Sequence, residues 1–201
     1  SGPVGCKAFL KDYLPSPQVK EEDGKYTLYT PAKTMGKVRD FFGNFLVIVR
    51  AYAYILTLGK EGIPEASANA VLNANYMMNR LKGSYKIAYD TQCMHEFVMD
   101  IAPLKDKTGI SAMDVAKRLL DFGIHPPTMY FPLIVHEALM IEPTETESKE
   151  TLDKACDLFL RIYKEAEENP EILHSAPNDC SIGRPDDVTA ARNPILKYNF
   201  N

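Results

Sequence analysis

The sequence predicts an α+β fold in which long buried helices precede a small, mainly antiparallel sheet with helices on one face. The segment 44–58 is apolar on nearly every side, which is typical of a helix buried between layers of a larger protein. After residue 84 the expected order is strand, strand, helix, strand, strand, helix, an order typical of α+β domains. We therefore separate a region 1–84 from a second region 85–201.

The first region begins with short elements between prolines. We expect a helix over Val4–Tyr13 and a strand over Tyr26–Thr30, which Pro31 ends. The apolar helix over 44–58 ends at Gly59. A second helix starts at Pro64, because the first turn of a helix tolerates proline, and it continues to Gly83.

Each helix of the second region follows a pair of strands. The four strands are expected over residues 85–90, 94–102, 128–135 and 137–143. Ser111 with Asp114 predicts a capping box for a helix over 112–123, and Thr144 with Glu147 predicts another ahead of a helix over 148–168. The prolines of His125-Pro126-Pro127 separate the first helix from the strand that follows it.

Charge and hydropathy exclude two classes of partner. The 23 basic and 27 acidic residues give a net charge of −4, and no long run of like charges indicates binding to nucleic acid or to an anionic membrane. The longest apolar run, 45–59, has fifteen residues and contains Arg50, whereas a membrane span needs about twenty. Four scattered cysteines without a CxxC pair indicate reduced thiols and a cytoplasmic location.

Two histidines begin sequences that resemble a zinc-binding helix. His95 and His136 are each followed by glutamate, but methionine stands where the second histidine of H-E-x-x-H is needed. Both are also expected on strands, which lack the i, i+4 geometry of the motif. We predict no metal site.

Three further groups have a structural interpretation beside a functional one. Cys93 and His95 could form a nucleophile and its base, although no third group orients them. The segment Gly2–Gly5 could approach a phosphate through its backbone, or form a plain turn. Arg50 could bind a substrate carboxylate, or pair with a structural Asp or Glu. His125 and Thr128 are turn residues or site residues. Without a complete catalytic set, a central catalytic group would lie elsewhere.

Six blocks of sequence resemble the pyridoxal-phosphate-dependent glycine dehydrogenase (decarboxylating) family, the P-protein of the glycine cleavage system. They include the segments HPPT and EPTETE, and together they occupy residues 2–15, 36–59, 70–83, 94–100, 114–153 and 190–194. The segment GNF and the sequence after AARNP resemble the second subunit of the two-subunit bacterial form.

The resemblance implies the C-terminal part of an aspartate-aminotransferase-like protein (PLP fold type I). Residues 1–84 would be the end of the large domain with the interdomain helices, and 85–201 the small α+β domain with a surface tail. The intact enzyme would release CO₂ from glycine on pyridoxal phosphate and pass the aminomethyl group to the lipoyl arm of H-protein. Its partners would be the N-terminal part of the P-protein, the first subunit and lipoylated H-protein, in an oligomer.

The resemblance also implies which residues lie near the site. Ser1, Gly2, Gly5, Thr34 and Gly36 are expected near the cofactor, and Arg39, Asn44, Arg50, His95, His125 and Thr128 near the substrate or the active site. The Schiff-base lysine is expected upstream of residue 1. No catalytic residue is therefore expected in this chain, which alone would be inactive and would not bind pyridoxal phosphate.

Two alternatives remain. The chain could be a free-standing α+β binding or interaction module without catalysis. It could also bind a thiol or lipoyl partner through the small domain alone.

Overall fold

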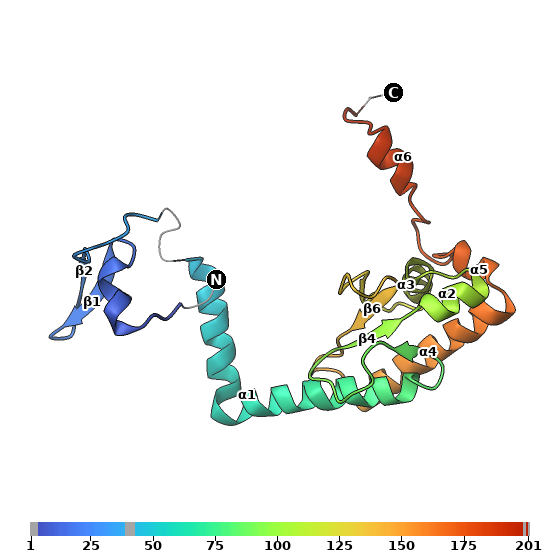
Figure 1. Cartoon of the computed structure of the whole chain (residues 1–201), viewed down its shortest axis with the longest axis horizontal. Helices are drawn as coiled ribbons and strands as arrows, with labels where there is room; N and C mark the ends of the chain where they lie inside the picture. Colours follow the sequence, from blue (N-terminus) through green and yellow to red (C-terminus); the bar gives the residue numbers. More distant parts are fainter. Residues whose placement is uncertain (1–3, 39–42, 199, 201) are drawn as a thin grey trace. The chain divides into compact units, whose positions relative to one another are not determined.

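The computed structural model describes residues 4–38, 43–198 and 200, and it divides into two compact units, Ser1–Ile63 and Pro64–Asn201 (Figure 1). The prediction of a boundary after residue 84 concerns the domains of a longer protein and stays a prediction.

The first unit contains a short helix and a hairpin. The 3₁₀ helix η1 (Ala8–Tyr13) is shorter than the helix expected over Val4–Tyr13. Strands β1 (Gln18–Glu22) and β2 (Lys25–Tyr29) pair antiparallel. Asp23 and Gly24 join them with φ angles of 53° and 73°, as a type I′ turn requires. We predicted β2 and missed β1, although an Asp-Gly pair between two runs of strand-forming residues predicts such a hairpin.

The element α1 (Phe45–Leu81) contains the two helices that we predicted, which follow each other without a loop. Its path is interrupted at Gly59, whose φ of 65° and ψ of −165° are not helical. Gly59 therefore ends the first helical segment as predicted. The second segment begins before Pro64 and not at it, so the predicted start is wrong.

The second unit is built around a four-stranded sheet in which every pair is antiparallel, with the order β3-β4-β6-β5. The strands are β3 (Lys86–Ile87), β4 (Phe97–Asp100), β5 (Thr128–Met129) and β6 (Ala138–Ile141). Each is shorter than predicted, and Ala102, which we expected at the end of a strand, belongs to the helix that follows β4. The antiparallel sheet itself is confirmed.

One face of this sheet forms the core. Phe97 pairs with Ile141 and Met99 pairs with Leu139, and all four side chains are buried. Val98 and Met140, the pair that lies between them, point to the other face and are half-buried. This alternation of period two agrees with helices on one face of the sheet.

Among the residues that the structure describes, five helices follow α1. The helix α2 (Ala102–Thr108) was not predicted, whereas α3 (Ala112–Asp121) and α4 (Lys149–Glu168) were. The helices α5 (Glu171–His174) and α6 (Asp187–Arg192) are short. The capping box of Ser111 and Asp114 on α3 is confirmed.

The capping box predicted for Thr144 and Glu147 is wrong. Ser148 caps α4, because its hydroxyl accepts a hydrogen bond from the backbone N–H of Thr151 at 3.2 Å. The hydroxyl of Thr144 instead lies 2.8 Å from that of Thr146. Three residues after Ser148 stands Thr151, where a capping box has glutamate or glutamine. The pattern of Thr144 and Glu147 was therefore the better match to a capping box in the sequence.

Charged side chains join the helices of the second unit. Asp153 on α4 accepts hydrogen bonds from Arg80 of α1 at 2.7 Å and from Lys149 at 2.7 Å, and also from the hydroxyl of Tyr76. On α3, Asp114 binds Arg184 at 2.7 Å, and this contact fixes the segment after α5 to the core.

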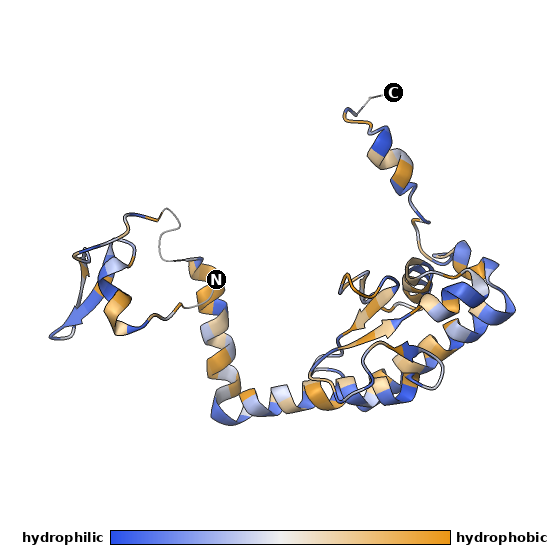
Figure 2. Ribbon diagram, in the orientation of Figure 1, coloured by the Kyte–Doolittle hydropathy of each residue, from blue (hydrophilic) through white to orange (hydrophobic). Residues whose placement is uncertain are grey.

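The first segment of α1 exposes apolar side chains. Phe45 and Leu46 are each 74% exposed, and Tyr52 and Leu56 are exposed as well. Figure 2 shows apolar residues along this segment. Among the described residues, no helix is long and apolar enough to cross a bilayer.

Candidate functional site: an apolar pocket in the second unit

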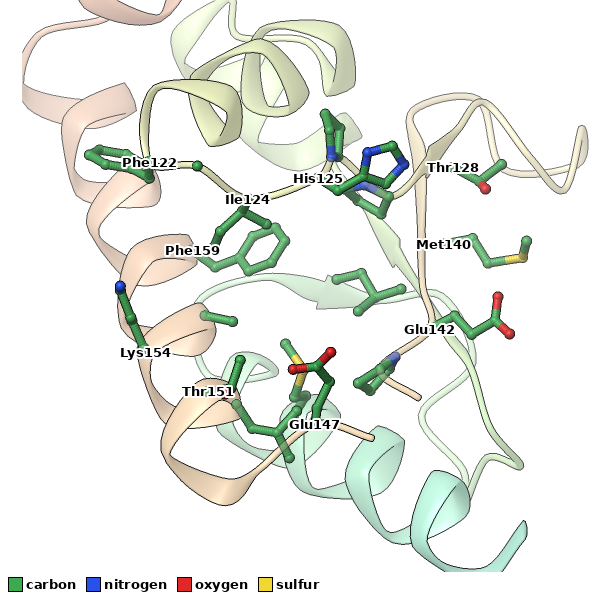
Figure 3. A pocket seen from close by; sticks show the side chains of 18 residues that line it. Phe122, Ile124, His125, Thr128, Met140, Glu142, Glu147, Thr151, Lys154 and Phe159 are labelled. Atoms are coloured by element: carbon green, nitrogen blue, oxygen red, sulfur yellow. The ribbon is translucent and has the colours of Figure 1, made fainter. Parts of the chain in front are cut away.

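A pocket of about 630 Å³ lies in the second unit, where the ends of three elements meet (Figure 3). Its walls are the loop 122–128 after α3, the end of β6 with residues 142 and 143, and the first turns of α4. Met77 of α1 adds one further side chain. The volume is that of a ligand-sized site.

Most of the lining is apolar. The apolar side chains are those of Met77, Phe122, Ile124, Pro126, Pro127, Met140, Ile141, Pro143, Leu152, Ala155 and Phe159. In Figure 3, Ile124 and Phe159 lie between the polar residues of the two sides. Aromatic and aliphatic walls of this kind favour an apolar occupant, since they exclude water from it.

The polar lining residues lie around these apolar walls. In Figure 3, His125 and Thr128 lie on one side and Glu147 and Thr151 on the opposite side, with Lys154 on the helix α4. Among the described residues, neither the carboxylate of Glu147 nor the ammonium of Lys154 has an ion-pair partner. Glu142 is the remaining charged residue, and two carboxylates against one ammonium leave the lining with a net charge of −1.

Asparagines of α1 position two loops beside the pocket. The side-chain amide of Asn73 donates to the carbonyl oxygens of Thr144 at 2.9 Å and Glu147 at 3.3 Å. Asn75 donates to the carbonyl oxygen of Cys93 at 2.8 Å and accepts from its N–H at 3.1 Å. The helix therefore holds the segment that carries Glu147.

Of the residues named from the sequence, only His125 and Thr128 line this pocket among those that the structure describes. His95 is exposed, and its Nε2 lies 3.9 Å from Oε1 of Glu142. Ser1, Gly2 and Arg39 lie outside the described residues.

The remaining predicted residues belong to the first unit. Thr34 donates its hydroxyl to the carbonyl of Leu14 at 2.6 Å, and Gly36 has a φ of 108°. The side chain of Asn44 accepts from the N–H of Val47 at 3.4 Å, as a helix cap does. Gly5 and Arg50 are exposed, so in this chain Arg50 is not the buried arginine that the apolar run suggested.

The two small motifs have no support in the geometry. Cys93, His95 and His136 lie outside the strands on which we had expected them. Burial raises the pKa of the Cys93 thiol, despite a backbone hydrogen bond that lowers it, and a raised pKa disfavours the thiolate that a nucleophile needs. Within the described residues, no three His, Cys, Asp or Glu side chains gather as metal ligands would.

The charged residues of the pocket were not predicted from the sequence. Glu142 and Glu147 lie within the block EPTETE, which we had interpreted as the end of a strand and a helix cap, and Lys154 lies one turn into α4. These residues share the stretch 125–148 with His125-Pro126-Pro127, and this closeness in the sequence could have indicated a common site.

The chain is similar to known proteins over nearly its whole length. The model of the family described as "Glycine dehydrogenase, C-terminal domain" matches residues 66–179. A relative from Treponema denticola is 58% identical over 98% of this chain, and one from Caldanaerobacter subterraneus is 58% identical over 98%. A relative from Thermococcus onnurineus is 54% identical over the full chain.

Each of these relatives is described as a probable glycine dehydrogenase (decarboxylating) subunit 2. The chain covers 41% of the length of each of them. With residues 66–179 matched by the family model, the chain belongs to the glycine dehydrogenase C-terminal domain family.

Proposed function

We propose that the chain is the C-terminal part of a pyridoxal-phosphate-dependent enzyme that decarboxylates glycine and transfers the aminomethyl group to the lipoyl arm of H-protein. The observation that carries this proposal is the identity of 58% to a probable glycine dehydrogenase (decarboxylating) subunit 2 over nearly the whole chain. Since the chain covers 41% of that relative, we assign the Schiff-base lysine to the remaining length.

The geometry supports a chain that does not hold pyridoxal phosphate by itself. The cofactor carries a doubly charged phosphate, whereas the pocket has two carboxylates and one ammonium. Gly5 is exposed, and a Cβ at this position would meet no atom within 4 Å, so Gly5 itself lies close to no other described group. We therefore propose that the chain alone does not bind the cofactor, and we assign no catalytic step to its described residues.

The exposed side of α1 supports a role for the first unit as an interface. Phe45, Leu46 and Leu56 would transfer large apolar surfaces out of water if another part of the protein covered them. We assign this cover to the N-terminal part of the P-protein, and we assign the first subunit and lipoylated H-protein as further partners of an oligomer. The four free cysteines favour a cytoplasmic location.

The site residues expected from the resemblance remain part of this proposal. His95, His125 and Thr128 would form the part of the small domain nearest to the active site. Thr34, Gly36, Asn44 and Arg50 would approach it through the first unit, together with Arg39, Ser1, Gly2 and Gly5.

A chimera tests the proposed function. The chain is joined behind the preceding part of the Treponema denticola relative, and the product is assembled with subunit 1 of that organism. We expect release of CO₂ from carboxyl-labelled glycine when lipoylated H-protein is present, and none from the chain alone. The matched control is the same chimera without subunit 1.

Two outcomes would overturn the proposal. A folded chimera that binds pyridoxal phosphate but releases no CO₂ would remove the assigned activity and favour the free-standing binding module. Release of CO₂ by the chain alone would show that the catalytic group lies within residues 1–201.

A further inference from the structure

Four residues on one face of α1 support a wall of the pocket. Relative to the first of them, the others follow after three, four and seven residues, and such spacings share one side of a helix. The four are Asn73, Tyr76, Met77 and Arg80. Met77 is buried and lines the pocket, while the other three bind residues of the turn before α4 and of α4 itself. This face of α1 therefore fixes the wall that contains the start of α4.

Asn73 attaches the turn before α4. Its side-chain amide donates to the carbonyl oxygens of Thr144 at 2.9 Å and Glu147 at 3.3 Å. Two contacts lie within the turn: the N–H of Glu147 donates to the carbonyl of Thr144 at 3.4 Å, and the hydroxyls of Thr144 and Thr146 lie 2.8 Å apart. These internal contacts shape the turn but bind it to no other element. The bonds from Asn73 therefore fix the backbone from which Glu147 reaches the pocket.

Tyr76 attaches the first turns of α4 through Asp153. The hydroxyl of Tyr76 donates to the carboxylate of Asp153, which also accepts from Arg80 at 2.7 Å and from Lys149 at 2.7 Å. Nζ of Lys149 lies over the ring of Tyr76, 5.3 Å from its centroid. The next residue of α4 is Lys154, which lines the pocket. A displacement of Asp153 therefore displaces Lys154 as well.

The supported wall belongs to the same pocket as His125. In Figure 3, Glu147 lies across the pocket from His125, which the proposed function places near the active site. We propose, on the basis of the proposed function, that Asn73 and Tyr76 are positioning residues of this site. The first acts through Glu147 and the second through Lys154. These two bind and orient the substrate, and no catalytic step falls to them.

The lipoyl arm is the substrate whose binding depends on this wall. Its alkyl chain suits the apolar lining of the pocket. The amide that joins the arm to a lysine has an N–H for the carboxylate of Glu147 and a carbonyl oxygen for the ammonium of Lys154. Glycine has no alkyl chain, so its binding does not depend on the wall.

The test uses the chimera with subunit 1 in which the proposed function is measured. Asn73→Ala and Tyr76→Phe are each expected to raise the KM for lipoylated H-protein about tenfold, since each removes hydrogen bonds that hold a binding group. The kcat and the KM for glycine should stay within about twofold. Asn79→Ala is the matched control for the asparagine, because Asn79 donates to the carbonyl of Asn75 in its own helix. It should change none of these values.

Double variants separate positioning from a loss of stability. Glu147→Gln alone is expected to raise the KM for H-protein, but in the Asn73→Ala chain it should add less than about twofold, because the carboxylate is already displaced. Lys154→Met should behave in the same way in the Tyr76→Phe chain. In the Asn79→Ala chain, Glu147→Gln should have its full effect. A purely structural role of Asn73 and Tyr76 would lower the number of active molecules and leave every KM unchanged.

A readout without catalysis accompanies the kinetics. In Tyr76→Phe, the backbone amides of residues 150–155 are expected to exchange with deuterium severalfold faster in the assembled chimera, because the start of α4 is held less firmly. Asn79→Ala should leave their exchange unchanged. Unchanged exchange in Tyr76→Phe would overturn the role of Tyr76.

Three kinetic outcomes would overturn the inference. The KM for H-protein could stay unchanged in both single variants of an active chimera, or the effects within both double variants could multiply. Either result would remove the positioning role and leave the proposed function standing. A folded chimera that binds pyridoxal phosphate but is inactive before any substitution would overturn the proposed function, and the positioning role with it.

Discussion

The guanidinium of Arg118 on α3 binds the carboxylate of Glu165 on α4 through two hydrogen bonds, from Nε at 2.9 Å and from Nη2 at 3.2 Å. The same guanidinium binds the buried Asp121 at 2.9 Å and lies over the ring of Phe122, 4.6 Å from its centroid. Phe122 lines the pocket, so this contact joins the packing of α3 and α4 to the pocket wall.

Replacing Arg118 is therefore expected to destabilise the second unit strongly. Arg118→Ala leaves the carboxylates of Asp121 and Glu165 without their main cation, and breaking such a buried pair costs about 3 kcal/mol. Arg161→Ala is the control, because Arg161 also binds Glu165 but its side chain is 58% exposed. Urea unfolding of both variants measures the difference, and equal losses would show that burial of Arg118 has no effect.

A second prediction concerns stability in acid. Hydrogen bonds from Lys149, Tyr76 and Arg80 lower the pKa of Asp153 from 3.8 to about 2. A carboxylate with a lowered pKa in the folded state stabilises it above the unfolded pKa, and this contribution is lost as the pH falls through the folded pKa. We therefore expect the free energy of unfolding to fall between about pH 4 and pH 2.

Asp153→Asn should make that fall shallower while it lowers stability at neutral pH. Glu150→Gln, a substitution of an exposed residue on the same helix, should leave the slope as it is. Guanidinium titrations at a series of pH values measure both slopes. An unchanged slope in Asp153→Asn would assign the acid sensitivity to other carboxylates.

The fold class was predictable because periodicity and caps are local signals. The strand expected within residues 94–102 and the pairing of Ser111 with Asp114 depend on neighbours in the sequence, and both are confirmed. The cap of α4 was predicted wrongly, because Thr144-x-x-Glu147 and Ser148 compete within one stretch and only tertiary contacts decide between them. Asn73 is such a contact, since it binds the carbonyls of Thr144 and Glu147 from α1.

The pocket was less predictable than the fold. His125 and Thr128 were named because they border two prolines, which is again a local signal. Lys154 and Phe159 join them only because α4 packs beside the loop after α3, and no spacing in the sequence shows that packing. Arg50 illustrates the opposite error: its neighbours in the sequence are apolar, yet its side chain is exposed.

A third prediction concerns the loop that Asn73 holds. Asn73→Ala removes two hydrogen bonds to the segment 144–147, each worth about 1 kcal/mol. We expect backbone amides of residues 145–148 to exchange with deuterium about tenfold faster. Asn79→Ala is the control, because Asn79 donates to the carbonyl of Asn75 within its own helix. Hydrogen exchange followed by mass spectrometry measures this, and equal protection in both variants would exclude the positioning role.

The last prediction concerns the interruption of α1 at Gly59. A φ of 65° with a ψ of −165° is accessible almost only to glycine, and a side chain there costs about 1–3 kcal/mol. Alanine also favours the helical conformation by about 1 kcal/mol over glycine. Gly59→Ala should therefore make the segment around it continuously helical.

Spin labels at Leu46→Cys and Glu61→Cys measure this change by electron–electron resonance, in a chain whose native cysteines are replaced. Fifteen residues of straight helix span about 22 Å. We expect the distance between the labelled positions to shift toward that value in Gly59→Ala and to stay unchanged in the control Thr57→Ala. A distance that Gly59→Ala leaves unaltered would show that contacts elsewhere in the first unit, and not the conformational freedom of glycine, impose the interruption.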